Sequence, residues 1–169
     1  MELVGRMPDG SVSTPYDLIG MLWPSAGPPI RQDEKMKRLQ GVPIFQRCSQ
    51  KQLRAVARIT EVFDAAPDSV LTRAGEPGRE FYFIYEGTVR VEVSPRKRVR
   101  LGPGDFFGEM SLLDGEPRSA TVIAETPLRL LVIKSRNFWG LLDEVPELTQ
   151  NVLLALSRRV RQAEKSPTT

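Results

Sequence analysis

The spacing of hydrophobic residues predicts two helices in the first third of the chain. The charged stretch that starts at Arg31 has the composition of a short helix, which is expected to end near Gly41 and Pro43. A second helix is predicted to begin at Ser49, because Ser49 and Gln52 have the spacing of a capping box. The apolar face of this second helix comprises Leu53, Val56 and Ala57, followed by Thr60.

The pattern changes to that of short strands from about residue 61 to residue 134. The run 81–85 is entirely apolar, whereas residues 89–93 alternate between valine and charged side chains. The dipeptide 86–87, Glu-Gly, lies between these runs and predicts a tight hairpin turn. Two further strands are predicted to meet at a bend at residues 126–127. The aromatic run is interpreted as core rather than as the floor of a ligand pocket.

Helical spacing returns in the last part of the chain. A short helix is predicted to start at Ser135, and a longer helix carries Pro146 in its first turn. An order of helices, then many short strands with Gly and Pro turns, then helices predicts a mainly β fold. We therefore expect a β-roll or jelly roll with flanking helices. The longer helix has an apolar stripe at Leu148, Val152, Leu156 and Val160.

Composition divides the chain into two predicted segments. Residues 1–30 are rich in proline and glycine and have no helical or strand period, so they are interpreted as an extension. Residues 31–169 are interpreted as one domain, since 169 residues is the size of an ordinary single domain. This domain is expected to comprise helices at 31–60, a β-roll at 61–134 and C-terminal helices at 135–165.

The composition favours a soluble protein without catalytic chemistry. Hydrophobic residues make up 40% and charged residues 27% of the chain. No run reaches the roughly 18 apolar residues of a membrane span, and the N-terminus lacks a signal-peptide layout, so a cytoplasmic location is expected. The absence of histidine removes His-based triads and most zinc centres, and the single cysteine, Cys48, excludes an internal disulfide. We expect no enzyme activity, no metal and no cofactor.

The charge of the chain gives weak support for a nucleic-acid partner. The formal net charge is +3, which is only mildly basic. The basic stretch 95–100 lies between two predicted strands, so a solvated loop tip is preferred over a nucleic-acid contact.

The stretch from Phe107 to Val122 carries the clearest chemical signal. A short helical turn beginning near Gly108 would leave backbone N–H groups unpaired, and such groups form an anion site that glycine lets a ligand approach. Arg118 would add a planar guanidinium that suits a phosphate, and Ser119 a hydroxyl donor. The carboxylate of Glu109 would repel a phosphate but can accept hydrogen bonds from a sugar hydroxyl. Together these groups predict a ribose-phosphate site.

The spacing alone leaves a second interpretation open. Glu109 and Arg118 could form a surface ion pair with no ligand between them. Such pairs contribute only about 0–1 kcal/mol to stability, and they are common.

The same stretch resembles the phosphate-binding cassette of the cyclic nucleotide-binding domain family. The family pattern reads F-G-E, an aliphatic residue, a small residue and L, then a variable loop and P-R-x-A-T/S-V. The resemblance extends to residues 75–91 and 101–109 and covers roughly residues 39–161. The matching residues are Phe107, Gly108, Glu109, Met110, Ser111, Leu112, Pro117, Arg118, Ser119, Ala120, Thr121 and Val122.

The resemblance implies a β-roll that binds cAMP or cGMP. By position, Glu109 would hold the ribose 2′-hydroxyl and Arg118 the cyclic phosphate. Backbone amides of the cassette and the Ser119 hydroxyl would add further donors. The binding residues implied in this way are Gly108, Glu109, Met110, Ser111, Arg118, Ser119 and Ala120.

The resemblance also implies a function as a regulatory module. The ligand, with cAMP preferred over cGMP, would favour a state in which the last helix closes over the site and presents a changed surface to an unidentified protein effector. One alternative is a transcription-regulator-like protein that lacks its DNA-binding domain; only SPTT follows Lys165, which argues against DNA binding. Another alternative is a β-roll interaction protein that has lost nucleotide binding. The sequence leaves a homodimer open.

Overall fold

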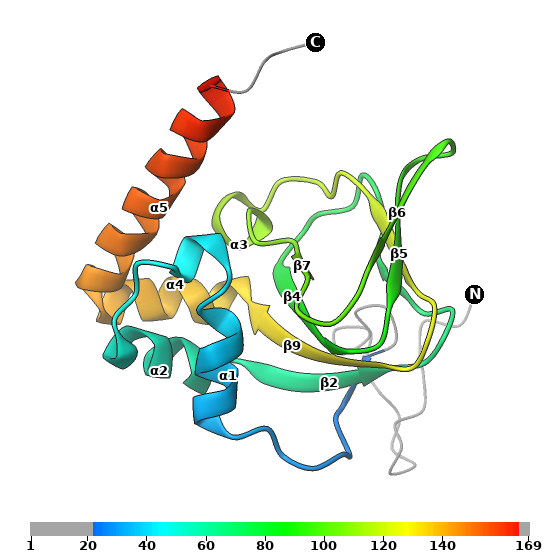
Figure 1. The fold of residues 1–169 in the computed structure, drawn as a ribbon, viewed down its shortest axis with the longest axis horizontal. Helices are drawn as coiled ribbons and strands as arrows, with labels where there is room; N and C mark the ends of the chain where they lie inside the picture. Colours follow the sequence, from blue (N-terminus) through cyan, green and yellow to red (C-terminus); the bar gives the residue numbers. More distant parts are fainter. Residues whose placement is uncertain (1–21, 166–169) are drawn as a thin grey trace. The chain divides into compact units, whose positions relative to one another are not determined.

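The computed structural model describes residues 22–165 (Figure 1). These residues fall into two compact units. The first unit comprises residues 22–29 and 60–135, and the second comprises residues 30–59 and 136–165. The first unit is made of antiparallel sheets and the second of helices, so the prediction of a mainly β fold with flanking helices is confirmed.

The first unit consists of two antiparallel sheets. The first sheet has the order β1 (Leu22–Pro24), β2 (Glu61–Ala65), β9 (Leu128–Lys134), β4 (Glu80–Glu86) and β7 (Phe106–Phe107). The second has the order β3 (Val70–Thr72), β8 (Thr121–Ala124), β5 (Val89–Ser94) and β6 (Lys97–Leu101). Strands that are adjacent in a sheet are mostly distant in sequence, which is typical of a roll rather than a simple meander.

Apolar side chains from both sheets form one core. Tyr82 and Ile84 on β4 and Leu130 on β9 are fully buried, and they belong to the same cluster as Val89 on β5 and Val122 on β8. The two-residue period of each strand puts these side chains on the inner faces of the sheets. The aromatic run of β4 is therefore core, as predicted.

The turn at Gly87 does not form the predicted hairpin. β4 and β5 lie in different sheets, so the chain crosses from one sheet to the other at this corner. Gly87 has φ +96°, and a Cβ there would lie 2.7 Å from Leu128 Cδ2 and 2.8 Å from Thr126 Oγ1. The sequence indicated a tight turn, but it could not indicate that β4 pairs with the distant β9.

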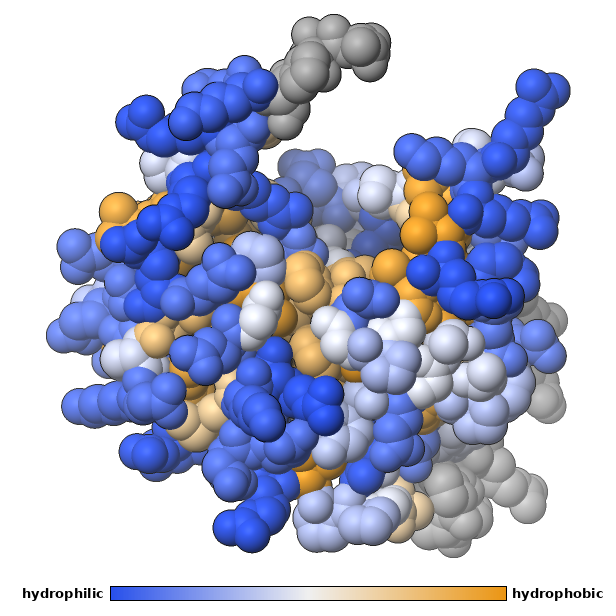
Figure 2. Space-filling view, viewed as in Figure 1, coloured by the Kyte–Doolittle hydropathy of each residue, from blue (hydrophilic) through white to orange (hydrophobic). Residues whose placement is uncertain are grey.

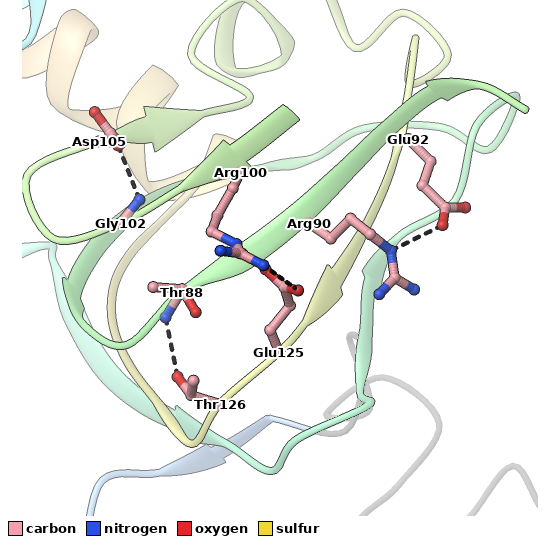
Figure 3. Close-up of polar contacts among 8 residues, drawn as sticks. All are labelled: Thr88, Arg90, Glu92, Arg100, Gly102, Asp105, Glu125 and Thr126. Atoms are coloured by element: carbon pink, nitrogen blue, oxygen red, sulfur yellow. Dashed lines mark hydrogen bonds and ion pairs between the residues drawn. The ribbon is translucent and has the colours of Figure 1, made fainter. Parts of the chain in front are cut away.

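The basic stretch 95–100 is not the predicted loop tip. Most of it forms β6, which pairs with β5 as a hairpin. The outer face of this sheet carries ion pairs: Arg90 Nε lies 2.9 Å from Glu92 Oε1, and Arg100 Nε lies 2.8 Å from Glu125 Oε1 (Figure 3). Because Arg98 and Arg100 alternate with Val99 and Leu101 along β6, these two cations lie on one face of the strand.

The second unit contains the helices α1 (Gln32–Leu39), α2 (Gln50–Arg58), α4 (Ser135–Glu144) and α5 (Pro146–Lys165), with a 3₁₀ turn at Pro43–Phe45; Ser135 itself belongs to the first unit. The predicted capping box is present: Ser49 Oγ accepts from Gln52 N, and Gln52 Oε1 accepts from Ser49 N. Phe45 and Phe138 meet edge to face at 5.9 Å. The stripe on α5 is buried at Leu148 and Val152, whereas Val160 is exposed.

The described part of the predicted extension adds a strand to the first sheet. β1 pairs with β2, and Arg129 on β9 donates to Ser25 Oγ at 3.1 Å and to the Pro28 carbonyl. The rest of the predicted extension, residues 1–21, lies outside the described residues.

Candidate functional site

Gly108 sets the backbone of the predicted anion-binding segment. It follows β7 and has φ +82°, a left-handed conformation that glycine adopts without a steric penalty. Ser111 N donates to Gly108 O at 3.1 Å, and the helix α3 (Ser111–Asp114) begins there. The predicted helical turn is therefore present and starts three residues after Gly108.

Arg118 is fixed by backbone hydrogen bonds to the loop that precedes β4. Its N–H donates to Glu76 O at 2.7 Å, and its carbonyl accepts from Gly75 N at 2.8 Å. A further backbone bond joins Gly78 N to Glu116 O at 3.3 Å. The loop at 75–78 and the segment at 116–118 therefore form one unit of structure, although about 40 residues separate them in sequence.

The Arg118 side chain fits between two glycines. A Cβ at Gly78 would lie 2.7 Å from Nε and 2.9 Å from Cδ of Arg118, and also 2.5 Å from Ser111 Oγ. A Cβ at Gly108 would overlap Nη1 of the same guanidinium. Neither position can take a side chain while Arg118 keeps this place, so the two glycines form a cradle for the arginine.

The guanidinium of Arg118 is also paired with Glu80 on β4. Nη2 donates to the Glu80 carbonyl oxygen at 2.8 Å and lies 3.4 Å from the carboxylate oxygen Oε2. The two side chains are only 7% and 14% exposed. Cζ of Arg118 also lies 5.8 Å from the ring centroid of Tyr82, within the range of a cation–π contact. Arg118 is thus a buried cation held by three kinds of contact.

Burial shifts the titration of the groups around Arg118. It raises the pKa of Glu80, because desolvation disfavours the carboxylate more than Arg118 and other nearby cations favour it. Burial, and secondly the charge of Glu80, raise the pKa of the Tyr82 hydroxyl well above its ordinary value. Tyr82 stacks on Phe107 at 4.9 Å and is fully buried.

The other carboxylate of the stretch, Glu109, is buried as well. It is 8% exposed, and Arg118 as a residue is 9% exposed. The interpretation as a surface ion pair is therefore wrong, because neither residue is on the surface. A buried cation and a buried carboxylate in one short segment, next to a glycine with left-handed backbone, suit an anionic ligand that also carries hydroxyl groups.

A family comparison decides what this arrangement is. Residues 63–145 match the model of the cyclic nucleotide-binding domain. The chain contains a cyclic nucleotide-binding domain. The cassette resemblance in the sequence and the match to the family model thus agree, and the matched range includes all seven predicted binding residues.

Similar proteins carry this domain as one part of a longer chain. A cyclic nucleotide-gated potassium channel of Mesorhizobium japonicum is 41% identical over 109 residues, which is 64% of this chain and 30% of the channel. A cyclic nucleotide-gated potassium channel of Rhizobium etli is 38% identical over 132 residues, 76% of this chain and 37% of the channel. This chain thus spans about a third of the length of these two relatives.

A solved structure has the same fold. The N-terminal domain of a transcriptional regulator from Streptomyces coelicolor A3(2) superposes with a TM-score of 0.69 at 29% identity. The superposition covers 75% of this chain and 92% of that domain. The cyclic nucleotide-binding domain of this chain is therefore similar to domains found in both channels and regulators.

The structure brings some of the predicted binding residues together. Gly108, Ser111 and Arg118 lie around the same cradle. Met110 and Ser119 are exposed, and Ala120 is half-buried with its carbonyl accepting from Thr72 Oγ1 at 3.1 Å. The roles of all seven residues in binding remain predictions.

Sequence reasoning missed three residues of the cyclic nucleotide-binding domain that surround Arg118. They are Gly78, Glu80 and Tyr82, which lie about 40 residues before it. Glu80 gave one signal, because it is a carboxylate next to a fully apolar run. Nothing in the sequence indicated which cation it would meet.

Two features do not occur in the part of the chain from 22 to 165. None of its helices combines the length and apolar character needed to cross a bilayer. No group of three or more His, Cys, Asp or Glu side chains in the same range is placed to hold a metal ion.

Proposed function

We propose that the domain binds a cyclic nucleotide, with cAMP preferred over cGMP, and acts as a non-catalytic receptor. The observation that carries this proposal is the buried guanidinium of Arg118. Its hydrogen bonds both use Nη2, whereas Nη1 and Nε, which pack against Gly108 and Gly78, make none. A planar cation with two remaining donor groups suits the single negative charge of a cyclic phosphate.

The remaining predicted residues fit the rest of such a ligand. Glu109 is proposed to accept a hydrogen bond from the ribose 2′-hydroxyl, since a carboxylate offers several acceptor sites and this one is buried beside Arg118 in the cassette. The amides of Gly108, Ser119 and Ala120 and the hydroxyl of Ser119 are proposed as further donors to the phosphate.

The purine is proposed to pack on the inner face of the β5–β6 hairpin. Val91 and Val99 are cross-strand partners, and Leu101 lies two residues further along the same face. Val91 and Leu101 pack against the core, whereas Val99 is 43% exposed. Figure 2 shows hydrophobic surface in this region bordered by hydrophilic side chains. An exposed apolar face of this kind suits one side of an aromatic base.

The output is proposed to be movement of α5. On this helix Leu148 and Val152 are buried, whereas Leu153 and Val160 are 61% and 57% exposed. A ligand that binds one arrangement of this helix more tightly shifts the population toward it. The changed exposure of Leu153 and Val160 would then be read by a protein effector. Hydrogen exchange of residues 146–165 with and without cAMP tests this step, and unchanged exchange at saturating ligand would contradict it.

Calorimetric titration tests the binding proposal itself. We expect cAMP to bind more tightly than cGMP, and both to bind more tightly than 5′-AMP, whose open phosphate has a different shape and charge. If neither cAMP nor cGMP produces a heat of binding, the result would instead favour a β-roll interaction protein that has lost nucleotide binding.

A further inference from the structure

The ion pair of Arg118 and Glu80 poses a problem for any anionic ligand. Nη2 of Arg118 serves both the carbonyl and the carboxylate of Glu80, and both side chains are largely buried. Two anions that share one buried cation repel each other, because the low dielectric screens them poorly. A phosphate that approaches Arg118 therefore meets the charge of Glu80 at close range.

A second observation lies beside this pair. The Tyr82 hydroxyl is buried and lies beyond ordinary hydrogen-bond distance of any partner, alone among the buried side-chain polar atoms of residues 22–165, although the Glu80 carboxylate is near enough to raise its pKa. Glu80 and Tyr82 are two residues apart on β4, so their side chains leave the strand on the same face. The guanidinium carbon Cζ of Arg118 also lies 5.8 Å from the centroid of the Tyr82 ring. A buried hydroxyl without a hydrogen bond destabilises the folded protein, so its retention needs an explanation.

We propose that Glu80 is an internal counter-anion, which a ligand phosphate displaces from Arg118, and that the Tyr82 hydroxyl then donates to the released carboxylate. This inference rests on the proposed function. In the free protein Arg118 is neutralised by Glu80. In the complex the guanidinium of Arg118 pairs with the phosphate, and the Tyr82 hydroxyl donates a hydrogen bond to the Glu80 carboxylate. Glu80 and Tyr82 act through Arg118 and are thus positioning residues.

This exchange, in which the ligand phosphate replaces Glu80 as the partner of Arg118, predicts how each variant changes the affinity for cAMP. Glu80→Gln keeps an acceptor for Nη2 but removes the competing charge, so cAMP should bind more tightly, by about threefold to tenfold. Tyr82→Phe removes the hydroxyl that donates a hydrogen bond to the released carboxylate of Glu80. This variant should therefore bind cAMP about tenfold more weakly, the equivalent of about 1.4 kcal/mol. In the double variant the Tyr82→Phe loss should shrink to twofold or less, because no charged carboxylate then needs the hydroxyl.

The pH dependence of binding gives a readout that a merely structural role would not change. The groups that act on Glu80 are Arg118, Tyr82, Arg79 and Lys134. Bringing in a phosphate adds a negative charge and weakens the contribution of Arg118, so it raises the pKa of Glu80 above its value in the free protein. The complex then binds more protons than the free protein. The affinity for cAMP therefore rises as the pH falls through the range between the pKa of Glu80 in the complex and its pKa in the free protein. The chain has no histidine that could produce such a slope instead.

The experiment is a calorimetric titration of cAMP into the full chain and its variants from roughly pH 5 to 8. Tyr85→Phe is the matched control for Tyr82→Phe, because Tyr85 lies on the same strand and its ring lies 5.8 Å from Arg129 Cζ. Glu92→Gln is the control for Glu80→Gln, because Glu92 pairs with Arg90 on the outer face of the other sheet. Both controls should leave affinity and its pH slope unchanged.

The outcomes separate the two proposals. Tighter binding by Glu80→Gln, loss of its pH slope and weaker binding by Tyr82→Phe support the exchange. Weaker or equal binding by Glu80→Gln, or no effect of Tyr82→Phe, overturns it while the parent still binds. If the parent binds no cyclic nucleotide, the proposed function itself fails.

Discussion

Gly108 and Arg118 are packed so closely that a single Cβ on the glycine would overlap the guanidinium. Gly108 also has φ +82°, so two different constraints act on one residue. Gly104 offers a comparison, because its φ is +90° but a Cβ there would meet nothing within 4 Å. The two glycines share a backbone requirement and differ in their neighbours.

Gly108→Ala should abolish or strongly weaken cAMP binding, whereas Gly104→Ala should not. Each substitution places a Cβ on left-handed backbone and should lower the free energy of unfolding by roughly 1–2 kcal/mol. Only Gly108→Ala also displaces Arg118, so its affinity should fall by tenfold or more. Denaturant unfolding and calorimetry measure the two effects separately. Equal affinity of the two variants would show that Arg118 does not need the space beside Gly108.

Arg118→Ala should weaken cAMP binding by about 1.5–3 kcal/mol, the usual worth of a hydrogen bond to a charged group. Arg118→Lys should recover only part of this loss, because an ammonium cannot present two donors in one plane. Direct titration of both variants measures the loss.

The control for Arg118 is Arg100→Ala. Arg100 is exposed and pairs with Glu125 outside the cassette, so its removal should leave affinity unchanged. Circular dichroism should verify that each variant is folded. An Arg118→Ala variant that is folded and binds like the parent would refute the phosphate role.

The local features of the fold could be predicted from the sequence. The capping box at Ser49 and Gln52 has a fixed spacing, and the two strands on either side of Thr126 and Pro127 have a clear boundary. Each of these features depends on residues within a few positions of each other. Such short-range signals survive in a single sequence because no partner from elsewhere in the chain is needed.

The pairing of distant strands could not be predicted in this way. Glu86-Gly87 has the chemistry of a hairpin turn, yet β4 pairs with β9 and β7 instead of β5. A left-handed glycine fits both a hairpin and a corner between sheets, so the residue type does not distinguish them. The partner of Arg118 was missed for the same reason, since Glu80 is 38 residues away and is brought near by tertiary contacts.

Glu109→Ala should weaken cAMP binding more than Glu109→Gln. Gln keeps an oxygen that can accept from the ribose 2′-hydroxyl, whereas Ala leaves that hydroxyl without a partner. The ligand 2′-deoxy-cAMP tests the contact directly. It should bind the parent more weakly than cAMP does, and the difference between the two ligands should nearly disappear in Glu109→Ala. An equal difference in the parent and in the variant would show that Glu109 does not contact the ribose.

Ser119 should limit the discrimination between cAMP and cGMP. Its side chain is exposed next to Arg118, and it supplies a hydroxyl without the β-branch that makes threonine stiff. A hydroxyl that rotates freely can donate to the phosphate of either nucleotide, so we expect cAMP to be preferred by a modest factor. In Ser119→Thr the restricted rotamer should hold the hydroxyl where it can also meet the guanine amino group, and the ratio of affinities should move toward cGMP.

Ser119→Ala is the control, because it removes the hydroxyl and should weaken the binding of both nucleotides without changing the ratio of their affinities. Competition titrations of both nucleotides against the three proteins measure these ratios. A parent that prefers cGMP tenfold would contradict the proposed preference and leave the family assignment in place.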